Sequence, residues 1–233
     1  MKINAAAVIS AVIFAALAAL TVLGHFFLDG KQYYLTGVLI IAAVCVPFFV
    51  SFEKNKPSAR ELVMLACLTA IAVASRAAFY SVPSVKPLCA VVIITAACLG
   101  AQTGFVCGVL SMFASNFIFG QGTWTPFQML GMGAVGLLAG AIFYNRKIRK
   151  NRIVLAVAGA ALCTVVYGLI VDLSSVLMMT TEFSIKQIAA IYASGVPFNL
   201  SHGATTGIVL LFLGKPMADK IERIKTKYGL YGG

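Results

Sequence analysis

The chain has 233 residues, of which 61% are hydrophobic and only 11% are charged, and its mean hydropathy is +0.96. A single soluble core does not accommodate this much apolar surface, because soluble domains are roughly half apolar and about a quarter charged. The formal net charge of +11 lies in short clusters between apolar runs, which argues against a nucleic-acid-binding face.

Apolar runs of about 20 residues, the length that an α-helix needs to cross hydrocarbon, recur along the whole chain. Because a bilayer offers the backbone no hydrogen-bond partners, these runs are expected to be helices. We predict an all-α polytopic membrane protein with about eight transmembrane helices, in two parts. Residues 1–57 hold two N-terminal helices, and residues 58–233 form a six-helix membrane domain with a basic C-terminal tail. The predicted spans are 4–28, 33–51, 61–79, 86–100, 103–119, 125–144, 153–178 and 198–214.

Two of these assignments have alternatives. Lys2 and the apolar run through Val22 resemble a signal peptide, but the run is long and a second span follows closely, which favours a retained helix. The fourth and fifth spans are short and separated only by the segment from Gly100 to Gly104, so they also fit one tight helical hairpin.

The distribution of Lys and Arg predicts the orientation. With the N-terminus inside, the cytoplasmic segments hold 14 of the 18 Lys and Arg residues, and only Lys31, Arg76, Lys86 and Lys186 lie elsewhere. The positive-inside rule therefore places both termini of a multi-pass membrane protein in the cytoplasm.

Two capping patterns predict helix starts. Ser58 with Glu61 forms a capping box that opens the third span. Ser184 with Gln187 predicts a second box, which starts a short outer-surface helix at about 185–194. Pro197 in the segment Gly195-Val196-Pro197 is expected to end that helix, because proline lacks the backbone donor that would continue it.

Polar side chains inside the spans gather at one depth. From the rise of about 1.5 Å per residue, Arg76 lies about 22 Å from the cytoplasmic start of its span, Asn116 about 20 Å and Asp172 about 30 Å. Unpaired ionisable groups are costly in a membrane, so this grouping indicates a pocket open to the outside. The candidate substrate-binding residues are Arg76, Lys86, Asn116, Gln121, Trp124, Gln128, Tyr167, Asp172, Asn199 and His202.

Other interpretations of these residues stay open. Any one of them also fits an interfacial position, where Arg, Lys and Trp are tolerated at low cost. Trp124, the only tryptophan, lies in a glycine-containing segment between two spans and fits an interfacial anchor as well as a stacking surface. Asp172 is an alternative partner for Arg76.

Small residues recur every four positions, a spacing that lets helices approach closely. Gly100, Gly104 and Gly108 follow it, and Gly136 and Gly140 repeat it on the next span; for these we favour packing within the chain. The stripe Ala66, Ala70 and Ala74 fits either internal packing or an interface with another subunit.

Catalytic and metal-binding patterns are not found in the sequence. It contains no H-E-x-x-H, no G-x-S-x-G and no P-loop. Its six cysteines form no C-x-x-C pair, and His25 and His202 are too few and too far apart to argue a metal site. We therefore predict a protein that is not an enzyme, has no cofactor and no metal, and relies on another chain for any ATP hydrolysis.

The polar segments resemble those of one known family, the substrate-binding S components of energy-coupling factor (ECF) vitamin importers. The likeness covers about 60–227 and six spans, and the two N-terminal helices depart from it. The segments that carry it are Ser75-Arg76-Ala77-Ala78-Phe79, Lys86-Pro87, Ser115-Asn116-Phe117, Gly120-Gln121-Gly122-Thr123-Trp124-Thr125-Pro126-Phe127-Gln128-Met129 and Pro197-Phe198-Asn199-Leu200-Ser201-His202.

The resemblance implies a prokaryotic plasma-membrane protein with a vitamin-binding pocket at the outer face. It also implies a membrane scaffold subunit that meets the Ala66/Ala70/Ala74 stripe, and two ATPase subunits as partners. Within the family the chain is most similar to cobalamin-type S components, although riboflavin, pantothenate, a queuosine precursor or a corrinoid all fit the polar and aromatic residues. A standalone ion-coupled secondary transporter is the alternative function, and an intramembrane enzyme or scaffold is a third.

Overall fold

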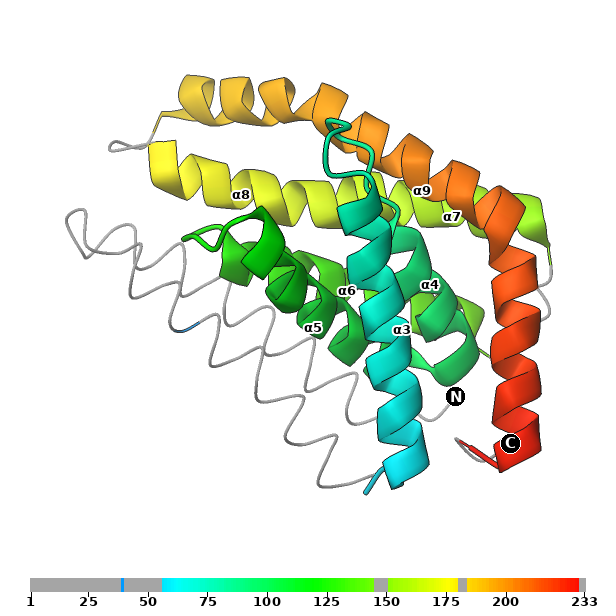
Figure 1. The fold of residues 1–233 in the computed structure, drawn as a ribbon. Coiled ribbons are helices and arrows are strands. Elements are labelled where there is room, and N and C mark those ends of the chain that lie inside the picture. Colours follow the sequence, from blue (N-terminus) through cyan, green and yellow to red (C-terminus); the bar gives the residue numbers. More distant parts are fainter. Residues whose placement is uncertain (1–38, 40–55, 145–150, 180–183, 231–233) are drawn as a thin grey trace.

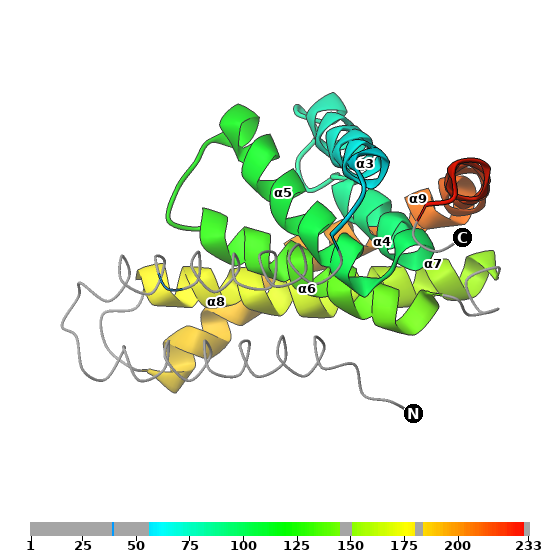
Figure 2. The same ribbon diagram turned by 90° about the horizontal axis from the view of Figure 1, so that it is seen from below.

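A computed structural model describes residues 39, 56–144, 151–179 and 184–230, and every regular element among them is helical. The elements are α3 (Ala59–Ala78), α4 (Leu88–Leu99), α5 (Ala101–Phe119), α6 (Thr125–Phe143), α7 (Arg152–Ala161), the π-helix η2 (Leu162–Tyr167), α8 (Gly168–Met179) and α9 (Ile185–Tyr228). Because α7, η2 and α8 form one continuous rod, these elements make six separate helices (Figures 1 and 2).

The expected all-α membrane fold is confirmed, but the count of eight helices is not supported. The six described helices match the predicted spans from 61–79 onward, and the spans 4–28 and 33–51 lie outside the described residues except for position 39. Five of the six are long and apolar enough to cross a membrane, namely Ala59–Ala78, Ala101–Phe119, Thr125–Phe143, Arg152–Met179 and Ile185–Tyr228.

The remaining helix, α4, lies at the centre of the bundle. It has only 12 residues, and every one of them is buried. Its neighbours are α3, α5, α6 and α9. A helix that is apolar on all sides is expected to be enclosed by other helices, which explains why this short segment belongs to the core. It is followed by α5 after the single residue Gly100, as expected for a tight hairpin.

Glycines bring α5 and α6 into close antiparallel contact. A Cβ atom on Gly104 would lie 2.8 Å from the Gly136 carbonyl oxygen, and one on Gly108 would meet the Met132 backbone. Gly140 lies in the same way against the backbone of Ala101. Side chains at these positions would push the two helices apart, so the predicted packing within the chain is confirmed for these glycines.

The last helix corrects two predictions. Instead of a short helix that ends before Pro197 and a separate span at 198–214, α9 runs without a break for 44 residues, with Pro197 and Pro216 inside it. Ser184 precedes α9, but its side chain makes no capping hydrogen bond. Membrane helices tolerate proline when neighbouring groups surround the freed backbone, and Gly195 lies close against α8 at this point.

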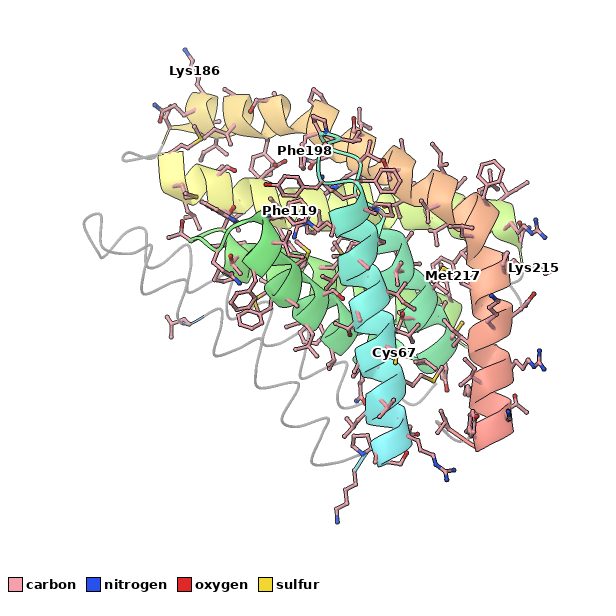
Figure 3. All side chains as sticks on the ribbon, viewed as in Figure 1. Cys67, Phe119, Lys186, Phe198, Lys215 and Met217 are labelled. Carbon is pink, nitrogen blue, oxygen red and sulfur yellow. The ribbon has the colours of Figure 1, made fainter. Side chains whose placement is uncertain are left out.

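Basic residues of α3 and α9 lie at the same end of the bundle. α3 begins at the confirmed Ser58–Glu61 capping box, next to Arg60. α9 changes direction near Pro216, between the labelled Lys215 and Met217, and its basic end lies on the same side as the start of α3 (Figures 1 and 3). There the Lys225 amine lies 5.2 Å from the centre of the Tyr144 ring, just after α6 ends.

Candidate functional site

A hydrogen-bond network joins α3, α5 and α6 at the end away from these basic segments. The Arg76 guanidinium, near the end of α3, donates to the Ser115 hydroxyl and, at 2.8 Å, to the side-chain oxygen of Asn116. Asn116 is buried and donates in turn to the Gln128 side chain at 2.8 Å and to the Thr125 hydroxyl at 3.1 Å. A charged side chain of α3 is thus held by polar groups of α5, which are bonded in turn to α6.

Thr125 connects this network to the loop that precedes α6. Its hydroxyl accepts from Asn116 and from the Gly122 backbone amide at 3.1 Å, and it donates to the Gln121 side chain at 3.0 Å. Gln121 also donates to the Phe113 carbonyl at 3.1 Å. The loop is therefore fixed to α5 and α6 by side-chain bonds. Gly120, just after α5, has φ +100°, a backbone conformation that residues other than glycine rarely adopt.

Two cations lie against one aromatic ring at this end. The Arg76 guanidinium carbon is 4.2 Å and the Lys86 amine 5.0 Å from the centre of the Phe119 ring, within the range of cation–π attraction. Lys86 donates to the carbonyls of Phe79 and Val82 at 2.7 Å and 3.2 Å, which secures the turn after α3. Burial and the nearby Arg76 charge lower the pKa of the Lys86 amine.

A second polar group joins α8 and α9. The Asn199 amide donates to the buried Asp172 carboxylate at 2.7 Å. A Cβ atom on Gly195 would lie 2.6 Å from that carboxylate, and one on Gly168 would lie 2.7 Å from the Asn199 amide. The two glycines therefore let the helices close around the Asp172–Asn199 pair.

His202 forms the third group with two aromatic rings. Its imidazole is 7% exposed and lies 5.6 Å from the Tyr167 ring and 5.0 Å from the Phe198 ring, measured between ring centres. The Tyr167 ring also packs against α6, where a Cβ atom on Gly131 would lie 3.1 Å from it. This third group therefore contacts α6 at a residue that follows Gln128 of the network by three positions.

The structure brings together most of the residues that the sequence singled out, but as three groups. Arg76, Asn116, Gln121 and Gln128 share one network, with Lys86 beside it through Phe119; Asp172 pairs with Asn199; Tyr167 contacts His202. The alternative that Arg76 pairs with Asp172 is wrong within the described residues, where Arg76 bonds to Ser115 and Asn116 instead.

Trp124 stays outside these groups. It precedes α6, is 39% exposed, and makes no capping bond with its side chain. Its ring packs over Gly122, where a Cβ atom would lie 2.5 Å from the ring. Both interpretations of Trp124, interfacial anchor and ligand contact, agree with this position.

Three contributors were not among the predicted site residues. Thr125 accepts two hydrogen bonds and donates one, Ser115 accepts from Arg76, and Phe119 lies against both cations. Thr125 and Ser115 fall in the segments that carried the family resemblance, so that likeness was the available signal. Among the described residues, no group of three or more His, Cys, Asp or Glu is placed to hold a metal ion.

The alanine stripe lies on the opposite face of α3 from the bundle. Ala66, Ala70 and Ala74 are all exposed, whereas Met64 and Leu68 are buried. Cys67 is exposed next to Ala66 and is labelled on α3 in Figure 3. Packing of the stripe against the described helices is therefore excluded.

A comparison with protein-family models matches residues 54–219 to the family described as ECF-type riboflavin transporter, S component. The chain belongs to this family. S components are transport subunits and not enzymes, so the predicted class is confirmed. No curated protein and no solved structure matches the chain. The match begins just before α3 and ends within α9, and so spans all the helices that carry the three polar groups.

Proposed function

We propose that this chain captures a ring-bearing vitamin at the outer face of the cell membrane and passes it inward with the help of ATPase partner subunits. The observation that carries the proposal is the buried network of Arg76, Asn116 and Gln128, which joins three helices at one end of the bundle. Ionisable and amide groups inside a membrane protein are costly, and they commonly mark the path or binding site of a solute.

The orientation follows from charge. The basic residues around Arg60 and Lys225 lie at the end of the bundle opposite Arg76, and basic segments favour the cytoplasmic side. The network then faces the outside, and both termini lie in the cytoplasm. This arrangement supports capture of a solute from outside the cell.

The cargo is proposed from the chemistry of the three groups and of Trp124, which lies outside them. Tyr167, Trp124 and Phe198 supply aromatic faces, and the amides of Asn116 and Gln128 supply donors and acceptors. A flat heteroaromatic ring with polar edges fits both features. The description of the matched family names riboflavin, which makes riboflavin the first candidate. Cobalamin is the second candidate, because the sequence resembles cobalamin-type S components.

The partners are proposed from α3. Its exposed stripe of Ala66, Ala70 and Ala74 offers a smooth surface on which another helix can approach closely. An ECF scaffold subunit that carries two ATPases is the partner that the family implies. The chain itself would then supply the specificity of the importer and no ATP hydrolysis.

The test is the identity of the bound small molecule. The full chain is purified in detergent, any co-purified compound is identified by mass spectrometry, and the emptied protein is titrated with riboflavin and with cobalamin. Tight binding of either vitamin supports the proposal and names the cargo. A folded protein that binds neither, but takes up solute in vesicles containing this chain alone, would establish the secondary-transporter alternative.

A further inference from the structure

The His202 imidazole is buried but has no hydrogen-bond partner. Its side chain is 7% exposed, and neither ring nitrogen is bonded to any described residue. Most buried polar groups in folded proteins are paired, because burial without a partner lowers stability. The other buried polar side chains nearby follow this rule: Asn199 bonds to Asp172, and the Thr206 hydroxyl donates to the His202 carbonyl.

The surroundings of the imidazole favour an apolar side chain for stability alone. Tyr167 and Phe198 lie on it at 5.6 Å and 5.0 Å between ring centres. A phenyl ring is planar and aromatic like an imidazole, although one ring atom larger, and it would occupy this place between two aromatic rings without an unpaired donor or acceptor. The chain therefore carries a polar ring where packing requires none.

The position of His202 connects it to the proposed binding region. Tyr167, whose ring contacts the imidazole, also packs against α6, where a Cβ atom on Gly131 would lie 3.1 Å from the ring. Gly131 follows Gln128 by three residues on the same helix. Phe198 of α9 and Phe119 at the end of α5 lie on the same side of the molecule, near the end of α3 (Figure 3). A solute held by the network on α3, α5 and α6 would therefore lie beside the aromatic rings that enclose His202.

We infer that His202 is a specificity-determining residue, whose free ring nitrogen forms a hydrogen bond to the polar edge of a ring-bearing ligand packed beside Tyr167 and Phe198. The inference rests on the proposed function and deepens it. A neutral imidazole offers one donor and one acceptor, so the ligand class is a flat heterocycle with a carbonyl, imide or ring-nitrogen edge. A ligand of the same shape without such a group would leave the imidazole unpaired and would bind more weakly.

The experiment compares His202→Phe with His202→Gln in the full chain. Riboflavin and cobalamin are titrated into each purified, emptied protein, and the thermal unfolding midpoint is measured without vitamin. His202→Phe is expected to weaken binding of the cargo at least tenfold while the midpoint stays equal or rises. His202→Gln keeps one donor and one acceptor and is expected to bind more tightly than His202→Phe. Ser201→Ala, an exposed neighbour, is the matched control and is expected to bind like the wild type.

Each other outcome overturns a defined claim. Equal binding by wild type and His202→Phe refutes the hydrogen bond while leaving the proposed function intact. If His202→Phe and His202→Gln both unfold at a lower temperature than the wild type, the imidazole is a structural residue, whereas destabilisation of His202→Phe alone reflects the larger ring, and the binding comparison then rests on His202→Gln. Equal loss in the Gln and Phe variants also contradicts recognition through a hydrogen bond. A wild-type protein that binds neither vitamin refutes the proposed cargo, and the inference with it.

Discussion

Replacing Asn116 with alanine is expected to weaken vitamin binding about tenfold to a hundredfold. Asn116 accepts a hydrogen bond from Arg76 at 2.8 Å and donates to Thr125 at 3.1 Å and to Gln128 at 2.8 Å. A neutral hydrogen bond contributes about 0.5–1.5 kcal/mol and one to a charged group about 1.5–3 kcal/mol, so the three bonds together contribute about 2.5–6 kcal/mol.

Only part of this free energy is expected in binding, because the three bonds are also present in the protein without ligand and contribute to its stability. A loss of about 1.4–2.8 kcal/mol corresponds to the tenfold to hundredfold weakening. Isothermal titration of the emptied protein with the identified vitamin measures it. Ala114→Ser, a small change at an exposed position on the same helix, is the control and is expected to leave the affinity unchanged.

A double-mutant cycle separates positioning from independent contacts. Asn116→Ala, Arg76→Met and the double variant are titrated in the same way. Residues in one hydrogen-bond network couple by about 0.5–3 kcal/mol, so the double variant is expected to lose less than the sum of the two single losses. Strictly additive losses, or normal binding by Asn116→Ala, would refute the view that Asn116 holds the guanidinium for the ligand.

Three further predictions concern packing, the partner surface and the loop. Gly136→Val is expected to lower the thermal midpoint through about 1–3 kcal/mol of overpacking against Gly104, and an unchanged midpoint would contradict the close α5–α6 contact. Ala70→Leu is expected to spare vitamin affinity but to reduce co-purification with the scaffold subunit; a complex that forms normally would contradict the assignment of the stripe to the scaffold contact. Trp124→Ala is expected to fold and to bind about twofold to tenfold more weakly, as the loss of an aromatic contact predicts. Normal binding would make Trp124 an interfacial anchor.

Local sequence rules predicted the parts of the fold that depend on neighbours in the chain. The Ser58–Glu61 capping box needs only residues three apart, and both of its hydrogen bonds are present. The apolar runs located all six described helices, although only four of them have the length that hydrocarbon thickness sets: α4 has 12 residues and α9 has 44. Depth along each span likewise placed Arg76 and Asn116 at similar heights, since the rise of a helix is fixed.

The same rules failed where a distant helix decides the outcome. Proline usually ends or kinks a helix in a soluble protein, yet α9 continues through Pro197. Gly195 is pressed against Asp172, so this glycine serves a close approach between α8 and α9 and not a helix end. Thr125 escaped notice for a related reason: its partners Asn116 and Gln121 lie on another helix and in the preceding loop, and a threonine at a helix start has no distinctive local pattern.

The four-residue spacing of small residues does not by itself identify what those residues pack against. Gly104 and Gly108 on α5 and the alanines on α3 share the four-residue repeat that permits close helix contact. The glycines meet Gly136 and the Met132 backbone on α6, whereas Ala66, Ala70 and Ala74 remain exposed. What distinguishes them is the partner that the fold supplies, and for the alanines the described helices supply none. Their partner is therefore lipid, another chain or a part of this chain outside the described residues, and the Ala70→Leu variant tests the assignment to the scaffold subunit.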